Sequence, residues 1–560
     1  MEKRLLLAAA LSLAVLLLWE WVVPKPTRPT PSPRETPAAS PAATPVVASE
    51  ATPSTASAAG APGTAPAPPA APASAAEQTA VTLSNGVLRA TFSNRGAVLE
   101  SFILTKYTDE QKKPLELVRA LPPELPRPLA LDFGKDTEAT KRIANALFLV
   151  EREPDSSSGS GSSDRRVRFR YADSTIAVTK EISIQAGYLF EVKVTVSGPP
   201  YGVLLGPGLR NPTDAERSSR YVMPASAVAA AADGLKLMRP EKATAASWPL
   251  APRGFAGIED NYFLEVLIPR APTTATVQSY SVPHPDGKPS VDLATAIAGQ
   301  GTLEAGAFFG PKDVSILESY GIGLERTVDF GWYGILARPL LWLLKKTNEV
   351  VHNWGLAILV VTFIVRLLLF PLTAKSYTSM KKMQKLAPKM NAIKDKYKKA
   401  KTDATQRQKM NTELMALYQS EGYNPMSGCF PVLLQLPILV AFYNVLSRTI
   451  ELRHAPFFLW IKDLSAMDGS YVLVGLMIVS MYVQQAMTPS TMDPAQKKVF
   501  LFMPILWAFF LKDMPSGLVL YWLFSNVLTI VQQLVMNRLA KEDPAPPSGG
   551  GAKALKQARA

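Results

Sequence analysis

The side chain whose position most constrains this sequence is Arg366, which lies inside the apolar run Trp354–Leu372. A charged side chain in the middle of a bilayer costs at least about 2.5–3.5 kcal/mol, and arginine does not escape that cost by losing its proton. The interiors of the apolar runs in the C-terminal half hold no Asp or Glu, and the nearest acid, Glu451, follows the end of its run. Thr362 lies one turn earlier on the same helix face. The pattern favours a water-filled cavity around Arg366.

Polar side chains recur in the other apolar runs. An alternative for Arg366 alone is that it reaches the headgroups near Pro371, which needs no cavity. Each of the other polar residues alone fits a hydrogen bond between helices. Together with an arginine that lacks an acid at the same depth, they predict a polar groove open to the cytoplasm and closed toward the outside. These residues are Gln435, Asn444, Gln484, Gln485, Ser525 and Asn526.

The sequence holds few residues that could form a metal site, a nucleotide site or a catalytic site. Cys429 is the only cysteine and there are three histidines, none near another in sequence, which excludes a multi-cysteine zinc site and leaves little for a histidine metal site. No G-x-x-x-x-G-K-[ST] motif occurs, so nothing indicates a P-loop ATP motor. We expect no catalytic residue, cofactor or metal. Paired acids such as Glu259-Asp260 leave a glycan-active site open as an alternative, although such pairs are more often solvated strand edges or turns.

The chain divides by composition into unlike parts. Residues 1–23 are an apolar run behind basic residues and predict an N-terminal transmembrane anchor; a cleavable signal peptide is the alternative. Residues 24–79 are almost entirely Pro, Ala, Ser and Thr, which predicts a disordered linker. Residues 80–329 contain short runs that alternate apolar and polar residues and predict an antiparallel β-sandwich.

Charge separates the two halves as clearly as composition does. The chain has a net charge of +14, but residues 24–330 carry −1 and residues 331–560 carry +15, with 27 Lys and Arg against 12 Asp and Glu. The basic half also holds most of the long apolar runs. A basic and apolar half indicates a membrane rather than a nucleic acid.

The C-terminal half predicts helices in a bilayer. The run Trp332–Thr347 is short for a span and predicts an amphipathic helix on the membrane surface. The run Val499–Leu511 has 13 residues, about 20 Å of helix, which we interpret as a place where the bilayer is thin; a buried helix is the alternative. The four predicted full spans are Trp354–Leu372, Cys429–Ile450, Tyr471–Met487 and Ser516–Met536.

The loop between the first two full spans sets the orientation. It carries twelve Lys and Arg against four Asp and Glu, so the positive-inside rule puts it in the cytoplasm. Counting crossings from this loop puts residues 24–330 and 451–470 outside and both termini inside. The basic tail at 542–560 agrees with that orientation.

The same loop predicts a hairpin of two amphipathic helices around Met380–Met390 and Gln408–Tyr418. Its methionines offer flexible apolar contact, and its lysines suit anionic lipid or ribosomal RNA. The alternative is that the methionines only pack the hairpin and the lysines only orient the chain in the membrane.

The motifs of residues 330–540 resemble, in series, those of the YidC membrane protein insertases. The anchor and the large β-domain are similar to the Gram-negative type of that family. The resemblance implies a multi-domain membrane protein with a periplasmic β-supersandwich at 80–329, a five-helix transmembrane insertase bundle at 330–541 and a cytoplasmic helical hairpin at 375–424. The motifs are Asn353-Trp-Gly-Leu-Ala-Ile, Thr362-Phe-Ile-Val-Arg366, Phe370-Pro-Leu-Thr373, Tyr377-Thr-Ser-Met-Lys-Lys-Met, Asn424-Pro-Met-Ser-Gly-Cys-Phe-Pro431, Gln435-Leu-Pro437 and Pro515-Ser-Gly-Leu-Val-Leu-Tyr-Trp522-Leu-Phe-Ser-Asn526.

The resemblance also implies a function and partners. The expected activity is that of an insertase and chaperone for integral proteins of the bacterial inner membrane, which works alone or with the Sec translocon and hydrolyses no nucleotide. The implied partners are nascent membrane proteins, the Sec translocon with its accessory subunits, anionic lipids, and the ribosome and signal recognition machinery through the basic hairpin and tail. We expect a monomer.

Site residues carry over from the family onto matching positions of this sequence. One departure is Trp522, where some relatives carry Tyr, and the long Pro/Ala linker is another. The groove residues are Arg366, Thr362, Gln435, Gln485, Tyr521, Trp522 and Asn526. The hydrophobic slide for a client helix is Leu433, Leu434, Pro437, Phe502, Pro504 and Ile505, and the hairpin residues are Met380, Lys381, Lys382, Met383 and Lys385.

Two other classes of function stay open at this point. A transporter or channel would open its groove alternately to both sides of the membrane, so water would reach Arg366 from the outside as well. A cell-envelope glycan enzyme would use its helices only as an anchor, and residues 80–329 would then be essential.

Overall fold

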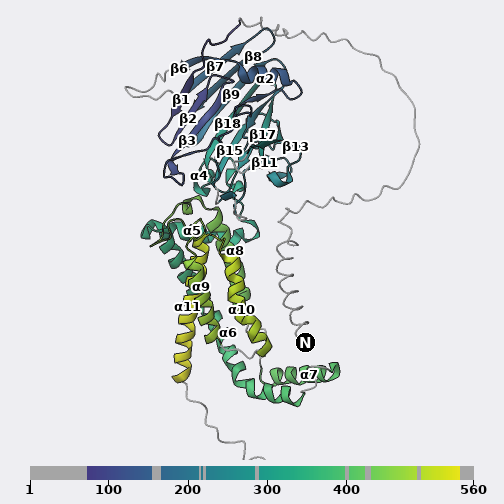
Figure 1. The fold of residues 1–560 in the computed structure, drawn as a ribbon, viewed down its shortest axis with the longest axis vertical. Helices are drawn as coiled ribbons and strands as arrows, with labels where there is room; N and C mark the ends of the chain where they lie inside the picture. The colour runs from purple at the N-terminus through teal and green to yellow at the C-terminus, as the bar shows by residue number, and fades with distance from the viewer. Residues whose placement is uncertain are drawn as a thin grey trace, which may run out of the picture.

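The computed structural model describes residues 72–153, 165–213, 216–217, 222–283, 289–397, 403–422, 430–488 and 494–542. The predicted anchor at 1–23, most of the predicted linker and nearly all of the predicted tail lie outside these residues. A β-domain lies at one end of the molecule and a bundle of helices at the other (Figure 1). We call the two ends of the bundle the β-domain end and the hairpin end.

The β-domain consists of three antiparallel sheets in the part of the chain that the structure describes. The four-stranded sheet has the order β1 (Ala80–Ser84), β2 (Leu88–Ser93), β3 (Val98–Thr108) and β4 (Pro114–Glu116). The five-stranded sheet has the order β13 (Ala246–Pro249), β16 (Thr274–Val282), β17 (Ser290–Gly299), β10 (Tyr201–Leu205) and β5 (Leu131–Asp132). The nine-stranded sheet has the order β12 (Gly234–Met238), β11 (Ser226–Ala231), β14 (Ala256–Glu259), β15 (Phe263–Pro269), β18 (Thr302–Pro311), β9 (Leu189–Ser197), β8 (Ala177–Ile184), β7 (Arg166–Ala172) and β6 (Leu149–Glu153).

The apolar residues that alternate with polar ones in the sequence are the residues that are buried in the strands. In β8 every second residue is buried, because successive side chains of a strand point to opposite faces of the sheet. Phe102 of β3 packs on Phe190 and Phe309 of the nine-stranded sheet, with ring centroids 5.9 and 5.3 Å apart. This aromatic core joins two sheets, and each buried ring contributes about 1.5–3 kcal/mol. The predicted antiparallel sandwich is confirmed.

The pair Glu259-Asp260 differs from its expected solvated position. Both side chains are buried, and each forms an ion pair: Glu259 with Lys312 at 3.2 Å and Asp260 with Arg210 at 2.5 Å. Burying a carboxylate is costly unless a cation compensates it, and the two cations come from other segments of the chain. The pair is therefore part of the packed structure and is not a solvent-open acid pair.

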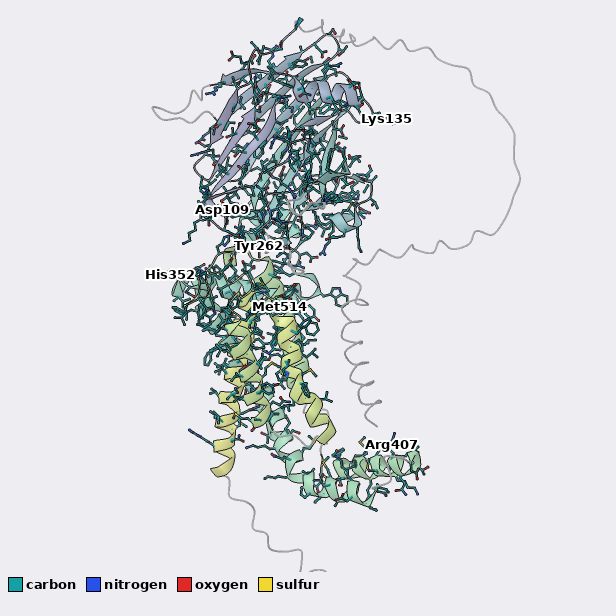
Figure 2. The ribbon with its side chains drawn as sticks, viewed as in Figure 1. Asp109, Lys135, Tyr262, His352, Arg407 and Met514 are labelled. Atoms are coloured by element: carbon teal, nitrogen blue, oxygen red, sulfur yellow. The ribbon has the colours of Figure 1, made fainter. Side chains whose placement is uncertain are left out.

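The turn that carries these acids lies against the helical bundle. Asn261 Nδ2 donates a hydrogen bond to the carbonyl of Ser447 at 3.4 Å, and Arg453 Nη1 donates one to the carbonyl of Thr108 at 2.8 Å. Figure 2 labels Tyr262 at this junction, with Met514 on the bundle side of it. The β-domain is thus fixed to the end of the second predicted span.

The helices of the bundle are α5 to α11, of which six lie close to the predicted segments and α6 continues well beyond its own. Shorter helices in the β-domain are α2 (Thr137–Asn145) and α4 (Val314–Ser319), with 3-10 turns at Pro240–Lys242 and Leu324–Thr327. Two more 3-10 turns, Gly331–Tyr333 and Ile450–Leu452, precede α5 and follow α8. The bundle helices are α5 (Gly334–Val351), α6 (Trp354–Lys396), α7 (Ala404–Ser420), α8 (Phe430–Arg448), α9 (Val472–Met487), α10 (Pro494–Leu511) and α11 (Ser516–Glu542).

Length and hydropathy mark two of these helices as long and apolar enough to cross a membrane, Trp354–Lys396 and the part Ser516–Arg538 of α11. Val472–Met487 and Val499–Leu511 are shorter apolar helices. The helix α10 starts at Pro494 and has 18 residues, about 27 Å, so it is longer than the predicted 13-residue run. Proline suits the first turn of a helix, where its missing N–H has no partner to lose. Because α10 is longer than the predicted run, its length does little to support the interpretation that the bilayer is thin there.

The predicted span ends at Leu372, but the helix does not: α6 runs without interruption for 43 residues, through Pro371 and Pro388, into the hairpin. A proline inside a helix removes one backbone hydrogen bond and strains the turn before it. The hydroxyl of Thr373 donates to the carbonyls of Leu369 and Phe370 near that turn. The first hairpin helix is therefore a direct extension of the first predicted span.

An ion cluster joins α5, α8 and the β-domain. Lys345 of α5 lies 3.0 Å from Asp313 and 2.5 Å from Glu451, which follows α8. Burial and the neighbouring Asp313 raise the pKa of Glu451 above its ordinary value, although Lys345 opposes that shift. Burial alone would lower the pKa of Lys345, but the two carboxylates outweigh it and raise that pKa. The Lys345 ammonium is therefore the group whose charge compensates both carboxylates, so its loss should destabilise the cluster more than the loss of either acid.

Replacing Lys345 with Met leaves two carboxylates close together, and we expect the free energy of unfolding to fall by about 2 kcal/mol. Glu451→Gln should cost less, because the Lys345–Asp313 pair remains. The matched control is Lys346→Met, whose partner Glu349 is exposed, with an expected loss of roughly 0–1 kcal/mol. Equilibrium unfolding of the full chain in detergent, followed by circular dichroism, measures all three. Equal losses for Lys345 and Lys346 would contradict this assignment.

Candidate substrate groove

Arg366 lies on α6 about three turns after the start of the helix. The helix begins where the Asn353 side chain accepts a hydrogen bond from the backbone N–H of Leu356 at 3.0 Å, a standard N-cap. The guanidinium Nε of Arg366 donates to the hydroxyl of Ser525 on α11 at 3.0 Å, and one terminal nitrogen donates to the same oxygen. The side chain of Ser525 is fully buried, while Arg366 is only partly buried.

The charge of Arg366 is not neutralised inside the bundle. Among the residues that the structure describes, no carboxylate forms an ion pair with Arg366, and Glu451 is engaged with Lys345 instead. A guanidinium has five N–H donors, and a single hydroxyl oxygen takes up only part of that capacity. The remaining donors are free for water or for an anionic group that enters from outside the bundle.

A third helix meets the same hydroxyl group. Gln435 of α8 donates through Nε2 to Ser525 at 3.0 Å and to the hydroxyl of Tyr521 at 3.1 Å. The ring of Tyr521 is buried and stacks on Phe442 of α8, with centroids 4.1 Å apart. Ser525 therefore joins α6, α8 and α11 at one point, and we call Arg366, Gln435, Tyr521 and Ser525 the polar centre.

The other predicted groove residues form no hydrogen bond with this centre in the described part of the chain. Thr362 is buried and its hydroxyl donates to the carbonyl of Ile358 in its own helix. Asn526 is buried and donates to Ser480 of α9 at 3.1 Å, so it faces away from Arg366. Trp522 packs edge-on against Trp507 of α10 at 5.0 Å. The amide oxygen of Gln485 is buried and has no hydrogen-bond partner among the described residues.

Ser525 is one of the six polar residues that predict the groove, but it is not among the seven groove residues carried over from the family. The sequence marks it as polar within an apolar run, but a serine in such a run more often bonds within its own helix. The signal that identifies it is its position four residues after Tyr521, which puts both hydroxyls on the same face of α11.

Two more hydrogen bonds continue from the polar centre toward the hairpin end. Gln532 of α11 donates to Thr373 of α6 at 2.8 Å, and Tyr377 of α6 donates to Asn537 of α11 at 2.9 Å. We call this line the α6–α11 seam. The seam ties α6 to α11 along that half of the bundle and closes the space between these two helices.

The predicted slide residues lie on α8 and α10. Phe502 and Ile505 of α10 are strongly exposed, at 66% and 54%, while Pro504 is buried. On α8, Leu434 and Pro437 are half-buried, and the Leu433 side chain lies outside the described part of the structure. An exposed apolar face of this kind fits acyl chains or another apolar helix.

The hairpin lies at the opposite end of the molecule from the β-domain, where Figure 2 labels Arg407. Lys389 pairs with Glu421 at 2.6 Å and Lys396 with Glu413 at 2.9 Å, which ties α6 to α7 and its end. Of the five predicted hairpin residues, Lys382 and Lys385 are exposed, whereas Met380, Lys381 and Met383 are half-buried.

Comparison with known proteins gives the family. A family model described as the 60Kd inner membrane protein matches residues 346–543, and a model of the YidC periplasmic domain matches residues 80–343. A membrane protein insertase YidC from Syntrophus aciditrophicus is 35% identical over 563 residues, covering 96% of this chain and all of that protein. This chain belongs to the YidC family of membrane protein insertases.

Two further matches accompany this one. The membrane protein insertase YidC of Geobacter metallireducens is 43% identical over 287 residues, which is 51% of this chain and 52% of that protein. A crystal structure described as an active YidC insertase with its first transmembrane domain resolved covers 82% of this chain and 94% of that chain, with 19% identity and a TM-score of 0.35. Members of the family are insertases rather than enzymes, and the chain is a protein of the inner membrane.

Because Ser525 accepts a hydrogen bond from Gln435, the effects of replacing these two residues on stability should depend on each other. In a double-mutant cycle, Gln435→Leu and Ser525→Ala should couple by about 0.5–1.5 kcal/mol in the free energy of unfolding, because each removes the same hydrogen bond. The matched cycle pairs Gln435→Leu with Thr529→Ala, whose hydroxyl donates to the Ser525 carbonyl in its own helix. That control should couple by about zero. Equal coupling in the two cycles would remove Ser525 from the polar centre.

Proposed function

We propose that this chain inserts client proteins into the inner membrane by admitting the polar flank of a client segment to the polar centre, from the cytoplasmic side. The supporting observation is a guanidinium inside the bundle that a hydroxyl group holds and no described carboxylate neutralises. Such a group attracts anionic client residues and retains water, which shortens the hydrocarbon that a polar segment has to cross.

The free energy for the step comes from the client. Its apolar segment leaves water for lipid, which is favourable by about 0.8 kcal/mol per buried CH₂ group. The exposed apolar faces of α8 and α10, including Leu436 at 47% and Phe502 at 66%, offer that segment a path beside the groove. No step in this scheme uses a nucleotide.

The positive charge of the hairpin and tail suggests how the chain is oriented in the membrane and which partners it contacts. The proposed orientation puts the hairpin and tail in the cytoplasm, both termini inside, and residues 24–330 in the periplasm. The exposed lysines of the hairpin fit contact with the ribosome, the signal recognition machinery and anionic lipid, and the Sec translocon with its accessory subunits is the proposed partner in the membrane. The proposed active unit is a monomer.

Arg366→Ala should reduce insertion of clients whose translocated flank is acidic by at least about tenfold, the equivalent of ~1.4 kcal/mol. Clients with an uncharged flank should change less than about twofold, because they do not use the charge. Arg366→Lys should restore most of the loss if charge matters more than the guanidinium shape. Protease protection of matched client pairs in cells with equal expression measures the effect. Normal insertion of acidic clients by the Ala variant would overturn the electrostatic part.

The slide makes a separate prediction. A photo-crosslinking residue at Ile505 or Leu436 should capture a stalled nascent chain during insertion, because these exposed positions lie on α10 and α8. The matched control is Leu476 on α9, which is 46% exposed, about as much as Leu436. It should capture at least about fivefold less, because it lies outside the proposed slide although it is equally accessible. Equal capture at all three positions would mean that the client meets the bundle without a preferred path.

A further inference from the structure

A hollow lies where α6 passes from its apolar part to the hairpin. Its volume is about 620 Å³. The wall on one side is α6, from Pro371 to Leu386, and the wall on the other is Glu421 and Gly422 after α7. None of the groove or slide residues lines it, so it is distinct from the substrate path described above.

Three lysines line the hollow from one face of α6. Lys375, Lys382 and Lys385 follow one another at spacings of seven and three residues, which puts their side chains on the same side of a helix. Among the residues that the structure describes, none of these three forms an ion pair or a side-chain hydrogen bond. The carboxylate that shares the hollow, Glu421, is already held by Lys389 at 2.6 Å. The hollow therefore has an excess of positive charge.

The same helix presents an apolar surface immediately before the hollow. Leu367 and Leu368 are 62% and 77% exposed, and Leu372 is 39% exposed. Lys375 follows Leu368 by seven residues, about 10 Å along the helix. A ligand that reaches from this surface into the hollow needs an apolar chain and an anionic head.

We propose that the hollow binds the headgroup phosphate of an anionic phospholipid of the inner leaflet, with an acyl chain along the exposed leucines. Ammonium groups act as point charges that can gather around one phosphate, and each lysine near an anionic membrane surface adds to the affinity. An RNA or an acidic peptide also carries negative charge, but it has no acyl chain to pack against the exposed leucines. The proposal deepens the lipid contact in the proposed function and rests on its membrane orientation.

The bound lipid has a consequence for the hairpin. Because α6 is continuous through the hollow, a headgroup held by Lys382 and Lys385 fixes the angle at which the hairpin leaves the membrane surface. The lipid then acts as a positioning ligand between the bilayer and the hairpin.

Binding of phosphatidylglycerol to the full chain in detergent, measured by native mass spectrometry, tests the proposal without any insertion assay. Lys382→Gln with Lys385→Gln should weaken binding about 10- to 30-fold relative to phosphatidylcholine. The control pair, Arg407→Gln with Lys409→Gln, removes the same charge from exposed positions of α7 and should change binding less than about twofold. Lys382→Arg with Lys385→Arg should keep the binding, since the charge remains.

Three results would overturn the proposal. Equal weakening in the two pairs would mean that only the total charge matters. Unchanged binding in the Lys382 and Lys385 pair would place the lipid elsewhere. Displacement of phosphatidylglycerol by a short acidic peptide of equal charge would assign the hollow to a peptide. Insertion activity is a separate readout, so loss of the proposed function and loss of this site remain distinguishable.

Discussion

A positive charge held inside an apolar bundle by a hydroxyl group governs the arrangement of the helices around it. Had a carboxylate faced Arg366, the pair would have been neutral and the helices could have closed over it. Ser525 instead accepts two donors of the guanidinium and leaves the charge in place. Such a charge is stable in a bilayer only with water or an incoming anion beside it. The proposed groove, an opening on one side of the bundle, meets this requirement and supplies the property that an insertase needs.

The polar side chains of α11 determine which side can open. Toward α6, α11 presents Ser525, Gln532 and Asn537 to Arg366 and the seam. Toward α9, Asn526 donates to Ser480 and Gln533 donates to Thr488, each at 3.1 Å. These bonds make α6, α9 and α11 one hydrogen-bonded unit. In the described part of the chain, α10 is held by the Trp507–Trp522 contact and a hydrogen bond from Tyr482 to the Leu501 carbonyl. In the proposed function, clients have their path beside α8 and α10, while the ion cluster around Lys345 holds the β-domain end of α8.

Much of this arrangement could be predicted from the sequence, for physical reasons. Apolar runs give the helices, alternation gives the strands, and an arginine without an acid, together with Gln435 and Ser525, predicts a polar groove. Tyr521 was added by the resemblance to the family. Ser525 and Asn526 were both predicted to line the groove, although adjacent residues differ by about 100° around a helix and only one of them faces Arg366. The spacing of four residues from Tyr521 is the signal in the sequence that favours Ser525. Glu259 and Asp260 were misread as solvated because their cations, Lys312 and Arg210, are 53 and 50 residues away. The continuation of α6 past Leu372 was not predicted, because the span was defined by its apolar residues and a helix does not have to end where its sequence becomes polar.

Water at Arg366 is the central claim, and the reactivity of a cysteine at that position tests it most directly. In a Cys429→Ser background, which removes the single native cysteine, Arg366→Cys is treated with a membrane-impermeant maleimide in inverted and in right-side-out vesicles. The account predicts labelling from the cytoplasmic face and none from the outer face. No labelling from either face would mean a dry interior, and labelling from both would mean a channel open through the membrane; either result contradicts a groove that stops partway.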